Sequence, residues 1–220
     1  MKKQLKIYLF LAVLAVFVSG CSEEGINGKG PVVEENRLVD DFSSLYLQIP
    51  AKLYVYNGTE QSVRIRTNQN LLSRIETTVV NGELIIETIP DVWIRNVSVL
   101  EVYITSDQVS DFTINGSGVI KIEDCLDVDN ASFEVNGSGD IYACGETETL
   151  SVRINGSGKF SGFDLQSSVA EVQITGSGDI QTTVSQALEA TISGSGNVEY
   201  KGSPQVTTQI SGSGNVRKRN

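Results

Sequence analysis

Four carboxylates in one short segment are the side chains whose spacing comes closest to that of an acid–base pair. They are Glu123, Asp124, Asp127 and Asp129. Two carboxyl groups can cleave a glycosidic bond when a fixed separation pushes their pKa values apart. Adjacency in a turn does not supply that separation, so we expect these four groups to lie on a solvated surface.

Histidine is absent from the 220 residues, which removes the commonest proton shuttle and the commonest metal ligand. Catalytic pairs of serine or cysteine with histidine are excluded for the same reason. We therefore predict a protein that is not an enzyme and has no catalytic residue, metal site or cofactor. Lysine- or arginine-based lyase chemistry stays open, so a polysaccharide-active enzyme is kept as an alternative.

Six Gly-Ser-Gly segments raise two ligand hypotheses, neither of which their context favours. Gly-x-Gly binds phosphate where it links a strand to a helix N-terminus, and no helical pattern follows it in this chain. Gly-Ser-Gly-Asp at Gly137 and Gly176 is similar to calcium-binding β-rolls, but these carry an aspartate in each turn of about nine residues. Here the position of that aspartate also holds Val119 and Lys159.

Cys21 ends an N-terminal leader and is the residue whose thiol we expect to be modified. Lys2, Lys3 and Lys6 precede an uncharged apolar run, 7–18, which is too short for an ordinary membrane span. The run leads into Val18-Ser19-Gly20-Cys21, which resembles a bacterial lipobox. We therefore predict a lipoprotein signal peptide at residues 1–20, with lipidated Cys21 as the first residue of the mature chain.

The segment that follows Cys21 predicts the location of the protein. Ser22-Glu23-Glu24 resembles the surface-export signal of Bacteroidetes lipoproteins, so we expect an outer membrane lipoprotein exposed on the cell surface. Residues 21–36 have little apolar content and are expected to form a flexible tether. Loss of the three leader lysines takes the formal net charge from −10 to −13, which argues against nucleic acid as a partner.

The Gly-Ser-Gly segments mark a repeat of about twenty residues. They begin at intervals of 21, 19, 20, 18 and 18 residues. Alignment on the first glycine gives apolar columns that alternate with polar columns, which is the period of a strand. The column two residues before the glycine is Ile114, Val135, Ile154, Ile174, Ile192 and Ile210, and the column four residues after it is Ile120, Ile141, Phe160, Ile180, Val198 and Val216.

These columns predict an all-β fold, a single-stranded parallel β-helix (β-solenoid) with rungs of about 18–21 residues. Asp140, Lys159 and Asp179 occupy one position in successive repeats, so stacking in register would place opposite charges side by side. The part before Asp111 keeps the alternation without the glycine marker. It predicts less regular N-terminal rungs, within a single domain that covers residues 37–220.

Two further cysteines fall in one column of this alignment. Cys125 and Cys144 each lie twelve residues before the next marker glycine. Stacking in register would bring their Cα atoms to roughly 5 Å, within the usual range for a disulfide. The column leaves two alternatives open, a disulfide or two stacked thiols.

Aromatic residues supply the candidate binding surface. Tyr46, Tyr54 and Tyr56 alternate with inward aliphatic residues, so we expect them to face outward. Trp93 follows Pro90 in an expected loop and could join them. An exposed platform of these four side chains could stack on sugars or on side chains of a partner.

Several segments resemble the family described as "putative auto-transporter adhesin, head GIN domain". They are Asp41-Phe42-Ser43, Asn70-Leu71-Leu72, Asn81-Gly82-Glu83-Leu84-Ile85-Ile86, and the terminal Ile-Ser-Gly-Ser-Gly-Asn-Val segments that begin at Ile192 and Ile210. The resemblance covers roughly residues 37–220. It implies a parallel β-helix in secreted or lipid-anchored proteins of Bacteroidetes-like bacteria, and it carries no catalytic residues.

The combined prediction is a non-enzymatic, adhesin-like binding module at the cell surface. The expected partners are the membrane, through the lipid at Cys21, and a glycan or protein ligand. The alternatives are a purely structural spacer of the cell envelope and the polysaccharide-active enzyme. The ligand and the oligomeric state are left open.

Overall fold

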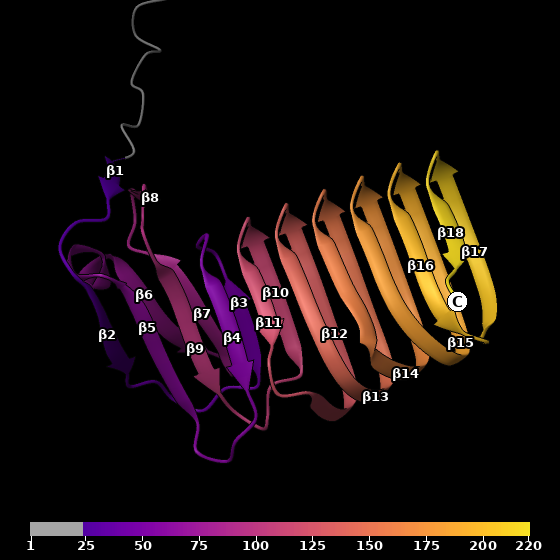
Figure 1. Cartoon of the computed structure of the whole chain (residues 1–220), viewed down its shortest axis with the longest axis horizontal. Coiled ribbons are helices and arrows are strands. Elements are labelled where there is room, and N and C mark those ends of the chain that lie inside the picture. The colour runs from indigo at the N-terminus through magenta and orange to yellow at the C-terminus, as the bar shows by residue number, and fades with distance from the viewer. Residues whose placement is uncertain (1–23) are drawn as a thin grey trace, which may run out of the picture.

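A computed structural model describes residues 24–220, which form a flattened coil made almost entirely of strands (Figure 1). The expected signal peptide and Cys21 lie outside these residues. Within 24–220 no helix is long and apolar enough to cross a membrane. The single-stranded parallel β-solenoid expected from the repeats is confirmed, because successive rungs pair in parallel along the coil.

Each rung has two faces, which meet at the Gly-Ser-Gly turn (Figure 1). We call the strands that lead into these turns the entry face and the strands that follow them the exit face. Several strands bend from the exit face of one rung into the entry face of the next. The rungs contain β10 (Asp111–Gly116), β11 (Val119–Ile122), β12 (Leu126–Gly137), β13 (Asp140–Gly156), β14 (Lys159–Gly176), β15 (Asp179–Gly194), β16 (Asn197–Gly202), β17 (Gln205–Gly212) and β18 (Asn215–Lys218).

The core lies between the two faces and consists of the predicted columns. Val135 pairs with Ile154, and Ile154 with Ile174, so that equal positions stack on one another. These three side chains are buried, whereas Ile210 in the last rung is 44% exposed. Stacked phenylalanines add a second column: the rings of Phe112 and Phe133 have centroids 5.1 Å apart. Apolar side chains at equal positions therefore bury each other from rung to rung, except at the open end of the coil.

The marker glycines are required by the approach of successive turns. Gly156 has φ +137°, a conformation that side chains disfavour, and a Cβ atom there would overlap the carbonyl oxygen of Gly137. That carbonyl accepts a hydrogen bond from the backbone N–H of Ser157 at 2.9 Å. Glycine therefore recurs because the turns are joined backbone to backbone.

The N-terminal rungs are less regular, as expected, and they close the end of the coil in a way that the sequence did not suggest. A first rung pairs with β10 and β11, and the next rung out pairs with that one in parallel. Outer strands then run antiparallel to them. These elements are β3 (Ser44–Leu47) with β4 (Lys52–Tyr56), β7 (Glu83–Thr88) with β9 (Leu100–Thr105), and the outer β5 (Ser62–Asn68), the 3₁₀ helix η2 (Gln69–Arg74) and β6 (Ile75–Val80).

The expected flexible tether at residues 21–36 is wrong over its described part. Residues from 24 onward form β1 (Glu24–Asn27), which pairs in parallel with β8 (Val92–Arg95), and β2 (Val32–Arg37), which pairs antiparallel with β5. The segment has few apolar residues because β2 is an edge strand, which β5 contacts along one side only. Its partners lie far away in the sequence, so composition alone could not reveal them.

Candidate functional site

One row of outward side chains crosses the N-terminal half of the exit face. It contains Arg64 on β5, Tyr103 on β9, Tyr54 on β4, Lys121 on β11 and Tyr142 on β13. Each is the paired neighbour of the next across adjacent strands. They point away from the core because the residues on either side of them, such as Val102 and Ile104, point into it. We call these five residues the tyrosine row.

Contacts along the row order its side chains. The rings of Tyr54 and Tyr103 stack with centroids 5.3 Å apart and planes 18° apart. The Arg64 guanidinium lies 4.6 Å from the centroid of Tyr103, and the Lys121 ammonium lies 5.6 Å from that of Tyr142. Cations over aromatic faces add attraction to the packing. The row is therefore a prearranged surface with little side-chain entropy left to lose on binding.

This arrangement changes the kind of recognition that the tyrosines offer. The facing sides of the Tyr54 and Tyr103 rings cover each other. A sugar cannot insert between them, so the stacking expected from the sequence is restricted to the ends of the row. Tyr142 is 40% exposed and lies at one such end. Along the rest of the row a ligand would meet ring edges, hydroxyl groups and the two cations.

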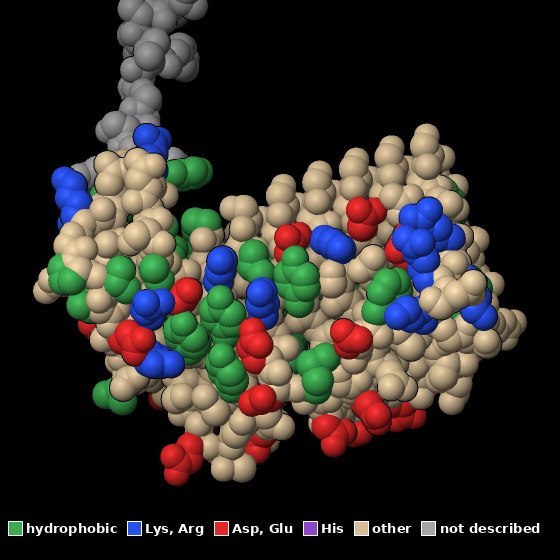
Figure 2. Space-filling model, in the orientation of Figure 1, with side chains coloured by type: hydrophobic (Ala, Val, Ile, Leu, Met, Phe, Trp, Pro, Cys, Tyr) green, Lys and Arg blue, Asp and Glu red, His purple; other side chains and the backbone are tan. Residues whose placement is uncertain are grey.

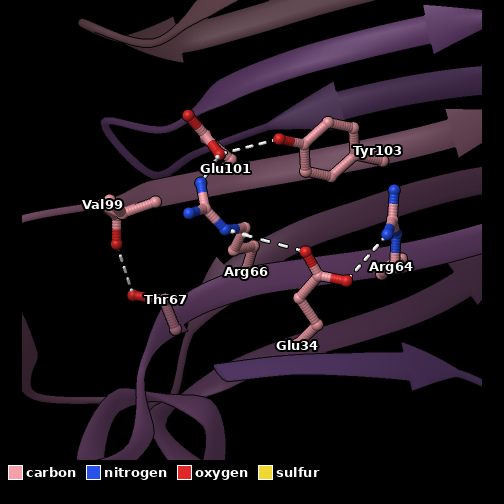
Figure 3. Close-up of polar contacts among 7 residues, drawn as sticks. All are labelled: Glu34, Arg64, Arg66, Thr67, Val99, Glu101 and Tyr103. Atoms are coloured by element: carbon pink, nitrogen blue, oxygen red, sulfur yellow. Dashed lines mark hydrogen bonds and ion pairs between the residues drawn. The ribbon is translucent and has the colours of Figure 1, made fainter. Parts of the chain in front are cut away.

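An ion-pair network holds the other end of the row (Figure 3). Glu34 on β2 accepts a hydrogen bond from the Arg64 guanidinium at 2.7 Å and lies 3.6 Å from Arg66. Glu101 accepts hydrogen bonds from Arg66 at 2.8 Å and from the Tyr103 hydroxyl at 2.7 Å. The network thus fixes both Arg64 and Tyr103. Because Glu34 belongs to β2, the segment expected to be a loose tether instead supports this face.

The same network sets the protonation of the row. Burial and the hydrogen bond to Glu101 raise the pKa of the Tyr103 hydroxyl, and burial with the nearby Glu101 charge raises that of Tyr54. Burial alone would raise the pKa of Glu101, but its hydrogen bonds from Tyr103 and Arg66 outweigh this and lower it. At neutral pH Tyr54 and Tyr103 are therefore protonated beside an ionised carboxylate.

A second row, beside the first, alternates in charge. Glu34, Arg66, Glu101 and Lys52 are neighbours in turn across β2, β5, β9 and β4. Farther along the coil the row continues with Asp140, Lys159 and Asp179, and the pairing of these three confirms the register predicted for them. Figure 2 shows hydrophobic, basic and acidic side chains interspersed across this face. Basic side chains gather only at the C-terminal end of the described face, whereas around the tyrosine row the two signs alternate and would not select a strongly charged polymer.

The four aromatic residues chosen from the sequence do not form one platform. Tyr54 and Tyr56 lie on the exit face, where Tyr56 is beside Thr105. Tyr46 lies on the opposite, entry face, where it pairs with Thr113. Trp93 lies on β8, against a recess of about 300 Å³ that reaches the turn at Gly116 and Ser117.

Tyr103 and Tyr142 were missed by the sequence reasoning. Tyr103 alternates with Val102 and Ile104, and Tyr142 with Ile141 and Ala143, so both carried the same signal of an outward position as Tyr54. What the sequence did not show is that β9 returns to lie beside β4. The tyrosine row depends on that return.

The structure joins Cys125 and Cys144 in a disulfide, with Cα atoms 4.8 Å apart. The next residues, Leu126 and Gly145, are paired neighbours on β12 and β13, which places the cysteines in a shared column. The bond links consecutive rungs where the chain bends from exit to entry face. We assign it a structural role.

The four carboxylates just before β12 and at its start lie on the solvated surface, as expected. Glu123, Asp124, Asp127 and Asp129 are all exposed. Among residues 24–220 no group of three or more acidic or cysteine side chains could hold a metal ion. These residues are surface charges.

Comparison with known proteins gives a family and several solved structures. The profile of the family described as "Putative auto-transporter adhesin, head GIN domain" matches residues 41–204. A "putative adhesin" from Bacteroides fragilis has a TM-score of 0.74 at 21% identity, covering 89% of this chain and 100% of that one. A "putative lipid binding protein" from Parabacteroides distasonis has a TM-score of 0.59 at 22% identity, covering 90% and 100%. No curated protein matches. At these identities the solved structures show a shared fold.

Proposed function

Because this chain belongs to the putative auto-transporter adhesin, head GIN domain family, we propose that it is a non-enzymatic binding module of the bacterial cell surface. Its ligand is a glycan or a protein, and its binding surface is the exit face around the tyrosine row. The module is held to the outer membrane through a lipid on Cys21. Both the anchor and the ligand go beyond what the family and its similar structures establish.

The tyrosine row is the observation that carries this proposal. Aromatic and arginine side chains are enriched where proteins bind partners, since they offer large contact area and several donors. Here three tyrosines and two cations are aligned across five strands and held by mutual stacking. A surface kept only for solubility would not require a half-buried ion-pair partner such as Glu101 beside it.

The chemistry of the row narrows the type of contact. The Tyr54 hydroxyl can donate to sugar hydroxyls or backbone carbonyls, whereas the Tyr103 hydroxyl already donates to Glu101 and can only accept from a ligand. Ring edges can contact apolar patches of either ligand. The alternating charges beside the row would favour a ligand with little net charge. An uncharged glycan or an extended polar segment of a protein meets these conditions.

A screen of the mature chain on arrays of surface glycans and of extracellular proteins tests the proposal. Retention of a defined ligand, with no change in its mass, supports a binding module. Release of a shortened glycan would instead show an enzyme. Failure to retain any ligand, by a protein shown to be folded, would favour a structural spacer and contradict the proposal.

A further inference from the structure

The two-stranded ribbon formed by β1 and β8 changes how far the domain can stand from its proposed anchor. A tether that ran over residues 21–36 could span more than about 50 Å. Because β1 begins at Glu24 and pairs with β8, only three peptide links separate Cys21 from the folded domain. Three residues reach at most about 11 Å. A lipid on Cys21 would therefore hold this ribbon against the bilayer.

The ribbon is fixed to the domain by its polar contacts. Asn70 donates its side-chain amide hydrogen to the carbonyl oxygen of Asn27 at 2.9 Å and accepts from the Lys29 backbone N–H at 2.6 Å. The Gly28 backbone N–H donates to the carbonyl oxygen of Arg95 at 3.3 Å. These bonds join the end of β1 both to η2, which contains Asn70, and to β8. The ribbon is thus part of the folded domain.

One side of the ribbon faces the domain and the other faces away. Ile94 is buried and Ile26 is half-buried against the core. Trp93 and Arg95 alternate with Ile94 and point outward, and Trp93 is 55% exposed. The paired neighbour of Trp93 is Gly25, which has no side chain, and Arg95 lies against that glycine. The indole ring and the guanidinium are therefore both left open on this side.

We propose that Trp93 and Arg95 form a membrane-interface contact, and that they enter the headgroup region of the bilayer that holds Cys21. This inference rests on the proposed lipid anchor. An indole ring prefers the boundary between headgroups and acyl chains, and a guanidinium pairs with phosphate. Acyl chains supply the membrane affinity, and the ribbon adds an orientation. The contact limits the angles at which the domain stands on the surface.

Trp93 is the only tryptophan of the chain, so its fluorescence reports on this contact alone. The mature lipidated protein is reconstituted into phosphatidylcholine vesicles with and without brominated acyl chains, and its association is measured by flotation. We expect Trp93 emission to move to shorter wavelength and to be quenched by the brominated lipid. The Cys21→Ser protein, mixed with the same vesicles, should show neither effect.

Each other outcome overturns the inference. If the protein floats with the vesicles but Trp93 emits as in the soluble variant, the ribbon does not contact the membrane, although the anchor stands. A shift without quenching would mean that the recess beside Trp93 holds one of the protein's own acyl chains, which carry no bromine, instead of lying against the membrane. If the protein does not float, the anchor fails and this contact fails with it.

A matched variant moves the probe away from the ribbon. Trp93→Phe combined with Val169→Trp places the single tryptophan on β14, where Val169 is 41% exposed. Its emission in brominated vesicles should be unquenched. Quenching equal to that of Trp93 would show that the domain lies on the bilayer without a specific contact at the ribbon.

Discussion

Tyr54 stacks on Tyr103 with ring centroids 5.3 Å apart, although four strands separate β4 from β9 along the chain. The contact exists because the chain runs outward through β5 and β6 and then returns, so that β9 pairs with β4 in parallel. The same return brings Arg64 over Tyr103 from β5. The irregular N-terminal rungs therefore both close the coil and build its candidate binding surface.

The stacked core columns predict a large effect of a single buried charge. Ile154→Asp would place a carboxylate between Val135 and Ile174, where the native side chain has no exposed surface. We expect a loss of about 3–5 kcal/mol in the free energy of unfolding, measured by urea denaturation. Ile210→Asp changes the same column at its exposed end and should cost less than about 1 kcal/mol. Equal losses would contradict the stacking described here.

The turn glycines predict that the same substitution, glycine to alanine, lowers the melting temperature by different amounts at two positions. Gly116→Ala and Gly156→Ala both require alanine at positive φ, which costs about 1–3 kcal/mol. Only Gly156→Ala also drives a methyl group into the preceding turn, since nothing lies within 4 Å of a Cβ at Gly116. The melting temperature should therefore fall further for Gly156→Ala. A larger fall for Gly116→Ala would mean that turn stacking is not the constraint.

The disulfide predicts a redox-dependent stability. Its cysteines are 19 residues apart, so on the chain-entropy account the bond contributes up to about 3 kcal/mol. Cys125→Ser and Cys144→Ser should each lower the unfolding midpoint in urea, and by similar amounts. The double variant should lower the midpoint little further than either single variant. Reductant should lower the wild type to the same midpoint. Additive losses in the double variant would contradict a bond between these two residues.

Glu199 predicts a pH dependence confined to acidic solution. Hydrogen bonds from Arg219, opposed by burial and reinforced by Arg217, lower the pKa of its carboxyl from 4.5 to about 2. Because the folded-state pKa lies below the unfolded one, the ionised group stabilises the fold above pH 4.5. That contribution is lost as the pH falls from 4.5 towards 2.

Urea denaturation of the wild type and of Glu199→Gln at a series of pH values measures the contribution of ionised Glu199 to the free energy of unfolding. The stability advantage of the wild type should be constant above pH 4.5 and should shrink below it, towards pH 2. Glu189→Gln, which changes an exposed carboxylate on β15, is the control. A wild-type advantage that does not change across this range would show that Glu199 makes no such bonds in solution.

The regular rungs could be predicted because each repeat gives independent evidence for the same register. Ile154 and Ile174 occupy equal places relative to two markers, so the alignment of one checks that of the other. The shared position of Cys125 and Cys144 was predicted in the same way, because each lies twelve residues before the next marker glycine. Here local pattern and tertiary pairing agree, since every rung pairs with the next rung along the chain.

The N-terminal part could not be predicted in this way because its strands pair out of order. Alternation alone would place Val97 and Val99 inward, but both are only half-buried, and the inward residues of β9 are Leu100, Val102 and Ile104. Nothing in the local sequence shows that β2 joins β5, or that Tyr46 and Tyr54 end on opposite faces. Alternation indicates that a side chain points outward, but it does not show which face it reaches.

The affinity of the chain for the ligand found on the arrays, compared between two sets of variants, tests the tyrosine row most directly. Tyr54→Ala with Tyr103→Ala removes the stacked pair from the exit face, and Tyr46→Ala removes a similarly half-buried tyrosine from the entry face. We expect the double variant to lose at least about 2 kcal/mol of binding free energy by isothermal titration, and Tyr46→Ala to bind like the wild type. Circular dichroism checks that both remain folded. Unchanged binding by a folded double variant, or an equal loss in Tyr46→Ala, would contradict the assignment of the exit face as the binding surface.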